Sequence, residues 1–147
     1  MFGYLRILVN GKSEVGSAKY VDASMCCITG VEAGDTAIKV ARRWAYRIKK
    51  IPPEQATVVF AKGNFWGRSI AALSASTDSN CYTDFGPYVP RFDKVPYNDL
   101  NALEEKFKQD PTVCAYMMEP IQGEAGVIIP NVCYFHLSSN LDRQMVE

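Results

Sequence analysis

The 147-residue sequence has no excess of charge of either sign, because 16 Lys and Arg residues balance 16 Asp and Glu residues. Proteins that bind nucleic acid or anionic membranes depend on a strongly basic surface, so this balance argues against that class of function. The sequence also has no apolar run of the roughly 18–20 residues that a membrane-spanning helix needs. We therefore expect neither nucleic acid nor a membrane among the partners.

Histidine is rare, and the cysteines are irregularly spaced. The five cysteines include no C-x-x-C pair, and His136 is the only histidine. These counts argue against a zinc site or a disulfide framework. With no G-x-S-x-G motif and no second histidine, a Ser-His or Cys-His hydrolase is also disfavoured. We expect a protein of a reducing compartment that holds no metal.

Helical and strand-like patterns alternate along the chain. Apolar residues recur at helical spacing in segments 34–50 and 98–110, with Asn98 as the expected cap of the second one. The segment 69–76, which is rich in small residues, reads as a further helix. Short uncharged apolar runs predict buried strands at 56–60 and 113–118. This order predicts an α/β fold with a mostly parallel sheet and crossover helices.

The remaining segments carry weaker patterns. Residues 77–83 are polar and read as a loop, and residues 85–97 read as an irregular connection with at most one edge strand near Val95. A β-prone run at 4–9 ends in Asn10-Gly11, a dipeptide typical of hairpin turns. Residues 131–147 show no clear periodicity.

Two segments that could carry chemistry follow the predicted strands, where ligands of α/β sheets bind. Residues 63–68, GNFWGR, place two adjacent aromatic side chains between two glycines and a guanidinium directly after the second one. Residues 119–124, EPIQGE, supply two carboxylates and a carboxamide. Aromatic rings offer a stacking face, and arginine offers a fork that fits a carboxylate. This composition favours a site for a flat ring and an acidic group.

A third segment, residues 29–34, opens the strongest predicted helix. Free amide groups and the helix dipole suit a phosphate at such an N-terminus. Glu32 and Asp35 add negative charge in the same turn, so a phosphate fits only if their side chains point aside. Taken one at a time, the three segments are more typical of an ordinary helix cap, core or rim aromatic residues and surface carboxylates.

Taken together, these segments resemble a known family. The strings that carry the resemblance occur in the family's order and approximate spacing: TGVEAGDTA (29–37), GNFWGR (63–68), FGP (85–87), PYNDL (96–100) and EPIQGEAGV (119–127). They are similar to the ornithine aminotransferases, which belong to the class III pyridoxal-phosphate-dependent aminotransferases of fold type I. The resemblance implies that residues 29–130 are part of a large cofactor domain, between divergent segments 1–28 and 131–147.

The resemblance implies a role for seven residues. The amides of Gly30 and Val31 would bind the phosphate of pyridoxal 5'-phosphate, Phe65 would stack on its ring beside Trp66, and Glu119 would lie near the cofactor. Arg68 would grip the substrate carboxylate, and Glu124 would pair with a distant arginine that controls which substrate end enters. The family reaction transfers the δ-amino group of L-ornithine to 2-oxoglutarate. It implies amino-acid and 2-oxo-acid substrates and a homodimer.

The sequence also departs from the family pattern. None of its nine lysines stands in the context of the family's Schiff-base lysine, and no string matches the aspartate that pairs with the pyridine nitrogen. Without that lysine the cofactor has no covalent anchor and the reaction has no base. We therefore assign no catalytic residue, and we expect a truncated or mis-spliced member that is inactive by itself.

Two alternatives stay open at this level. The chain could be a non-catalytic fragment that binds a phosphorylated ligand or pairs with a subunit, or it could be related to acetylornithine or 4-aminobutyrate aminotransferases. The Phe65-Trp66 pair favours ornithine among these substrates. Animal members of the family are mitochondrial, but acidic Glu14 and Asp22 among the first basic residues make a poor transit peptide, which leaves the cytoplasm as the alternative.

Overall fold

The computed structural model describes residues 29–131 and Tyr134, and the predicted hairpin at 4–11 and the segment 135–147 lie outside these residues. The described part consists of seven elements, which are α1 (Gly30–Arg47), β1 (Thr57–Ala61), α2 (Ile70–Ala75), α3 (Ser79–Tyr82), β2 (Phe92–Val95), α4 (Leu100–Gln109) and β3 (Val113–Met117). None of the helices described is long and apolar enough to cross a lipid bilayer.

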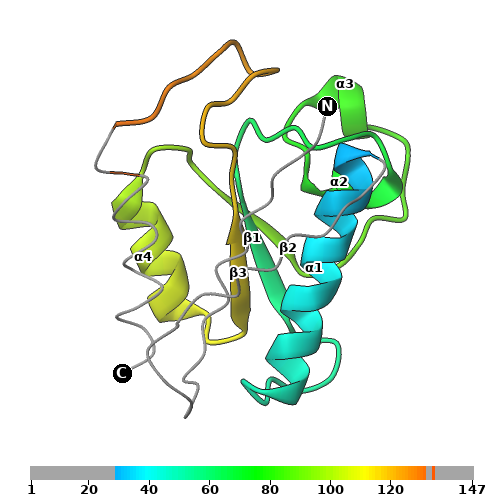
Figure 1. The fold of residues 1–147 in the computed structure, drawn as a ribbon, viewed down its shortest axis with the longest axis vertical. Coiled ribbons are helices and arrows are strands. Elements are labelled where there is room, and N and C mark those ends of the chain that lie inside the picture. The colour runs from blue at the N-terminus through cyan, green and yellow to red at the C-terminus, as the bar shows by residue number, and fades with distance from the viewer. Residues whose placement is uncertain (1–28, 132–133, 135–147) are drawn as a thin grey trace.

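The three strands form a parallel sheet in the order β2-β1-β3 (Figure 1). The chain passes through α2 and α3 between β1 and β2, and through α4 between β2 and β3. Helical connections of this kind are what parallel neighbours require, since each strand must return to the same end of the sheet. The predicted α/β class with crossover helices is confirmed, and so is the edge strand at Val95.

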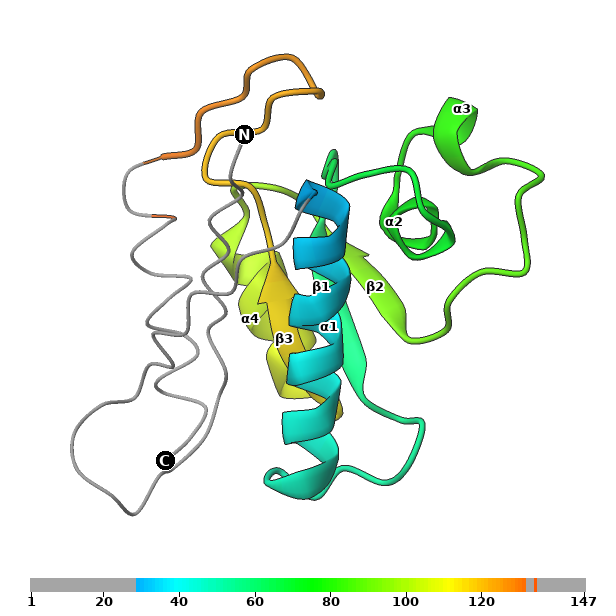
Figure 2. The same cartoon turned by 45° about the vertical axis from the view of Figure 1, so that its right-hand side comes forward.

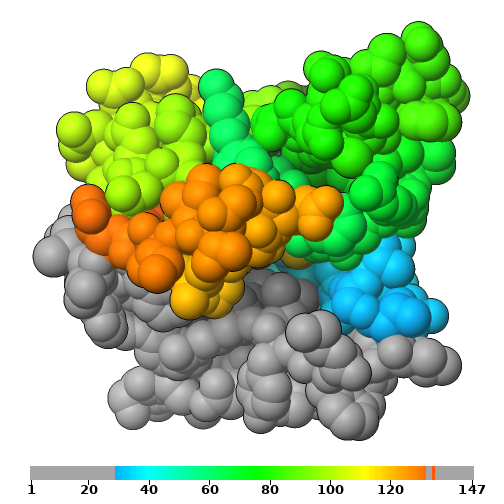
Figure 3. Space-filling view, turned by 90° about the horizontal axis from the view of Figure 1, so that it is seen from above, coloured from blue at the N-terminus to red at the C-terminus, as the bar shows by residue number. Residues whose placement is uncertain are grey.

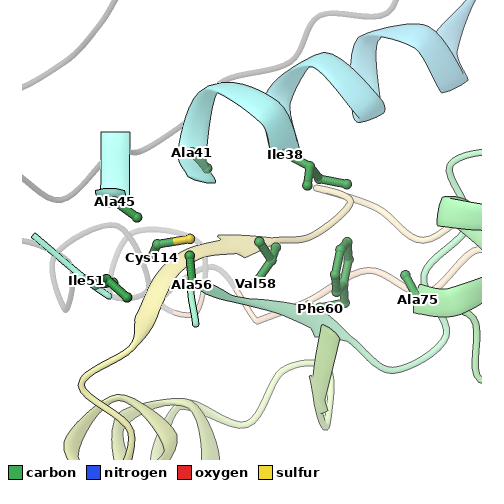
Figure 4. Close-up of a cluster of buried hydrophobic side chains, with 9 residues drawn as sticks. All are labelled: Ile38, Ala41, Ala45, Ile51, Ala56, Val58, Phe60, Ala75 and Cys114. Atoms are coloured by element: carbon green, nitrogen blue, oxygen red, sulfur yellow. The ribbon is translucent and has the colours of Figure 1, made fainter. Parts of the chain in front are cut away.

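The sheet lies between helices on both faces (Figure 2). The side chains of β1 alternate between the two layers. Val58 and Phe60 pack with α1, and Val59 packs with Leu103 and Phe107 of α4. Figure 4 shows the first of these clusters, where small residues of α1 such as Ala41 allow the helix to approach the sheet closely. All five residues of β1 are buried, as the uncharged run predicts for a central strand.

Helix α1 begins four residues before the predicted start at position 34. A capping box explains the difference: the Thr29 hydroxyl accepts a hydrogen bond from the Glu32 amide (3.4 Å), and the Glu32 carboxylate accepts one from the Thr29 amide (3.1 Å). The helix ends at Arg47 instead of position 50, and Lys50 adopts a positive φ of 62° before the two prolines.

Two local predictions were wrong. The predicted loop at 77–83 contains the short helix α3, which Asp78 caps by accepting a hydrogen bond from the Asn80 amide (3.0 Å). The cap of α4 is Asp99 instead of Asn98, and its carboxylate accepts from the Ala102 amide (3.0 Å). Asn98 has a positive φ of 64° and accepts a hydrogen bond from the distant amide of residue 131, so its side chain is used outside the helix.

Candidate functional site

The three segments that could carry chemistry meet at one edge of the sheet. Residues 63–68, called the aromatic loop here, follow the carboxyl end of β1, and residues 119–124, called the carboxylate loop, follow β3. The N-terminus of α1 lies at the same edge, at the top of Figure 1. Figure 3 looks down on this edge and shows the loop after β3 beside the start of α1. This is the edge where α/β sheets bind ligands.

The aromatic loop is tied to the body of the domain by Asn64. This residue is buried, and its side-chain amide donates to the carbonyls of Ala61 (2.8 Å) and Ala75 (2.9 Å). The main-chain amide of Gly63 donates to the Thr77 hydroxyl (2.9 Å). The loop is therefore anchored to the end of β1 and to α2 before its aromatic residues begin.

The two aromatic side chains of the loop have different surroundings. The Trp66 ring is parallel to Phe60 of β1 (centroids 6.2 Å apart, planes at 6°), so Trp66 extends the core to the edge of the site. Phe65 is 36% exposed, and the Arg68 guanidinium lies 5.5 Å from its ring centroid. Arg68 also donates to the Cys81 sulfur (3.5 Å) and is exposed. Of the two rings, Phe65 is the more available to a ligand.

Glu119 joins the two loops. One oxygen of its carboxylate accepts a hydrogen bond from the Phe65 amide (3.0 Å), and the other accepts from the Gly123 amide (3.4 Å). Hydrogen bonds to an ionised acceptor are stronger than neutral ones, so this carboxylate is an effective link between the loops. Glu124 is exposed and forms no ion pair with a residue that the structure describes.

Two glycines allow α1 to approach the aromatic loop. A Cβ on Gly34 would lie 2.5 Å from the Trp66 ring, and a Cβ on Gly67 would lie 2.5 Å from Cγ2 of Val31. Both distances are shorter than van der Waals contact. The predicted phosphate-binding residue Val31 therefore packs directly against the loop that carries Phe65 and Arg68.

Gly67→Ala should lower the free energy of unfolding by about 1–3 kcal/mol, because Gly67 has a φ of +148° and its Cβ would overlap Val31. Urea unfolding followed by circular dichroism measures this change. Gly123→Ala is the matched control, since a Cβ on Gly123 meets no atom within 4 Å. Equal stability of the two variants would contradict the close packing of α1 on the loop.

Tyr97, to which the sequence gave no role, holds the start of the carboxylate loop through its hydroxyl. The Tyr97 hydroxyl donates to the carbonyls of Glu119 (3.0 Å) and Pro120 (3.2 Å). Its ring meets Tyr134 edge-on (5.7 Å), and Tyr134 shares a hydrogen bond with Tyr116 (2.5 Å). Burial raises the pKa of Tyr97, with smaller contributions from Tyr134 and Glu119, so the phenol remains a donor. Tyr97 belongs to the string PYNDL, but nothing in that string indicates this contact.

The chain matches a family model over residues 7–144, and the model's description is aminotransferase class III. The match includes every residue of the edge described above.

The chain belongs to the class III aminotransferases.

Proteins of this class, including ornithine aminotransferases, use pyridoxal phosphate. This class III chain is 59% identical over 106 residues to mitochondrial ornithine aminotransferase from Rattus norvegicus, and 56% identical over 106 residues to the one from Drosophila melanogaster. Each match covers 72% of this chain and 24% of the relative.

Solved structures of aminotransferases also superpose on this chain, in agreement with its membership of the class III family. Ornithine aminotransferase from Toxoplasma gondii superposes with a TM-score of 0.77 at 49% identity, covering 80% of this chain and 28% of that one. Acetylornithine aminotransferase from Elizabethkingia anophelis gives a TM-score of 0.60 at 32% identity, over 80% of this chain and 24% of that one. This chain therefore spans about a quarter of the length of the relatives it matches, and its fold is part of a pyridoxal-phosphate transferase domain.

Proposed function

We propose that residues 29–131 form the pyridoxal 5'-phosphate-binding edge of an ornithine aminotransferase. The observation that carries this proposal is the meeting of three elements: the start of α1, the exposed Phe65 ring and the Glu119 carboxylate. Val31 touches the aromatic loop at Gly67, and Glu119 bonds to the Phe65 amide, so the three predicted cofactor contacts form one connected surface.

The start of α1 fits a phosphate group. The amides of Gly30 and Val31 lie in the first turn of α1, where no carbonyl of the helix is in position to accept from them. Such helix N-termini attract anions. The space beside Gly30 is open, since an added Cβ meets no atom within 4 Å. The Glu32 carboxylate turns back to the Thr29 amide, which leaves the amides of Gly30 and Val31 for the phosphate.

The aromatic loop fits the flat ring of the cofactor. Phe65 offers a partly exposed face, while Trp66 is held against Phe60 and shapes the wall beside it. When bound, pyridoxal phosphate supplies the electron sink that stabilises a carbanion at the substrate carbon. The residues described here position its ring and phosphate, and in this proposal they take no part in proton transfer.

Arg68 and Glu124 complete the proposed site on the substrate side. Arg68 lies beside the Phe65 ring, where its guanidinium can donate two hydrogen bonds to a carboxylate of an amino acid or 2-oxo acid. Glu124 lies on the carboxylate loop, close in sequence to Glu119, and it would hold an arginine from outside the described residues. We propose L-ornithine and 2-oxoglutarate as substrates, a homodimer as the assembly, and a mitochondrial location, as in the names of the rat and fly relatives.

Pyridoxamine 5'-phosphate should bind this chain reversibly and quench the fluorescence of Trp66. It carries the ring and phosphate but needs no Schiff-base lysine. A Trp44→Phe background leaves Trp66 as the only tryptophan, since the sequence has two. Phe65→Ala should raise the Kd about 10-fold through the lost ring contact, whereas the exposed Phe85→Ala should leave it unchanged.

Pyridoxal phosphate itself should leave the purified chain on dialysis, because no lysine stands in the family's Schiff-base context. Absorbance spectra before and after dialysis test this. A yellow species that survives dialysis would contradict the assignment of no catalytic lysine. Absence of any quenching by pyridoxamine 5'-phosphate would remove the proposed cofactor site.

A further inference from the structure

A buried carboxamide lies within the carboxylate loop, most of whose other residues are exposed. Gln122 is 1% exposed, while its neighbour Ile121 is 52% exposed. The side-chain Nε2 donates to the carbonyl of Lys62 (2.7 Å), at the end of β1. The main chain of Gln122 is held as well, by paired hydrogen bonds to Ile128 (3.0 and 2.8 Å). Gln122 therefore connects the carboxylate loop, where its main chain is held, to the residue just before the aromatic loop.

The aromatic loop is shaped to receive this side chain. Gly63 has a φ of +79°, and a Cβ at this position would lie 3.0 Å from Oε1 and 3.2 Å from Nε2 of Gln122. A larger residue at position 63 would press on the carboxamide. On the other side of this contact, Thr77 accepts from the Gly63 amide and Asn64 is bonded to Ala75. The first residues of the aromatic loop, Gly63 and Asn64, are thus held between Gln122 on one side and Ala75 and Thr77 on the other.

We propose that Gln122 is a positioning residue, which sets the aromatic loop against the carboxylate loop so that the Phe65 ring faces the cofactor. It works together with Glu119: Gln122 holds the loop at Lys62, and Glu119 holds it three residues further on at the Phe65 amide. This inference rests on the proposed function, because the orientation of Phe65 matters only if a ring binds there.

The chemistry of the contact explains why a glutamine suits it. The Lys62 carbonyl needs a donor, and a neutral carboxamide supplies one without placing a charge in a buried position. Gln122→Glu has the same shape but would place a carboxylate oxygen against that carbonyl. Gln122→Met has a similar length and removes the donor without adding charge.

The test compares two probes on the folded protein. In Gln122→Glu and Gln122→Met, the Kd for pyridoxamine 5'-phosphate should rise about 10-fold, because the ring contact is misplaced. The Kd for inorganic phosphate should stay within about 2-fold, because the α1 amides do not depend on Gln122. Gln109→Glu, the same substitution at an exposed position of α4, is the control. Equal losses for both probes, or no loss for either, would overturn the proposal.

Hydrogen exchange separates this proposal from the proposed function. The peptide containing residues 62–67 should exchange about 10-fold faster in both variants than in the unchanged protein. If pyridoxamine 5'-phosphate does not bind the unchanged protein, the proposed function fails, and this exchange rate decides only whether Gln122 holds the aromatic loop in place. Identical exchange in variants and parent would overturn the role.

A measurement without any variant covers the case in which both substitutions prevent folding. The side-chain amide protons of Gln122 should exchange about 100-fold slower than those of a free carboxamide, as a buried hydrogen bond requires. An exchange rate equal to the free rate would overturn the proposal.

Discussion

Phe60→Ala is expected to lower the free energy of unfolding by about 3–5 kcal/mol, the largest loss of stability expected for a single change in this domain. Phe60 is fully buried in the central strand, and its ring packs against Phe92 (4.7 Å) and Trp66 (6.2 Å). Removing the ring leaves a cavity between the sheet and α1. Because small domains are stable by only about 5–15 kcal/mol, this change would remove a large share of the stability.

Urea unfolding monitored by circular dichroism measures this effect. Phe85→Ala is the matched control, because Phe85 is 54% exposed and its loss should change stability by less than about 0.5 kcal/mol. A loss below about 1 kcal/mol for Phe60→Ala would contradict the central position of this ring. Where the variant retains a folded fraction, the emission of Trp66 should shift, because Trp66 loses the ring that lies parallel to it.

Arg68→Lys is expected to raise the KM for the carboxylate-bearing substrate at least about 10-fold, because lysine cannot form the two parallel hydrogen bonds of a guanidinium. The value of kcat should change little if the contact is equally strong in the ground and transition states. This expectation follows from the proposed role of Arg68 beside the Phe65 ring.

A chimera makes the measurement possible. Residues 29–130 would replace the matching segment of rat ornithine aminotransferase, to which the chain is 59% identical over 106 residues. Arg43→Lys, the same substitution at an exposed position of α1, is the control and should leave KM unchanged. An unchanged KM in Arg68→Lys would remove this residue from the substrate site. A chimera that is inactive before any substitution would instead contradict the proposal that this segment belongs to an ornithine aminotransferase.

Patterns of neighbouring residues predicted most of the elements. The periodicity of α1, the buried run of β1 and the apolar face of α4 each depend on contacts that repeat within one element, so they are visible in the sequence. One of the two wrong predictions concerns a single side chain with competing partners. Asn98 and Asp99 are both good caps, and only the contact of Asn98 with residue 131 leaves Asp99 as the cap of α4.

At the candidate site, too, the sequence indicated the segments, and the structure added the contacts between them. The strings that include Gly30, Phe65 and Glu119 indicated which segments matter, and the class III family and its cofactor follow from them. The roles of individual residues remain predictions, as do the boundaries at 28 and 131. Tyr97 and Gln122 received no role from the sequence, since each acts on a carbonyl more than twenty residues away.

The sequence by itself determined the α/β class, most of the helices and strands, and the family. These depend on local periodicity and on strings that keep their spacing along the chain. Only the tertiary structure decided that Val31 packs on Gly67, that Glu119 holds the Phe65 amide, and that Gln122 fills the space beside Gly63. The physical reason is that such contacts join separate crossovers of a parallel sheet, and their partners meet only after the strands have paired.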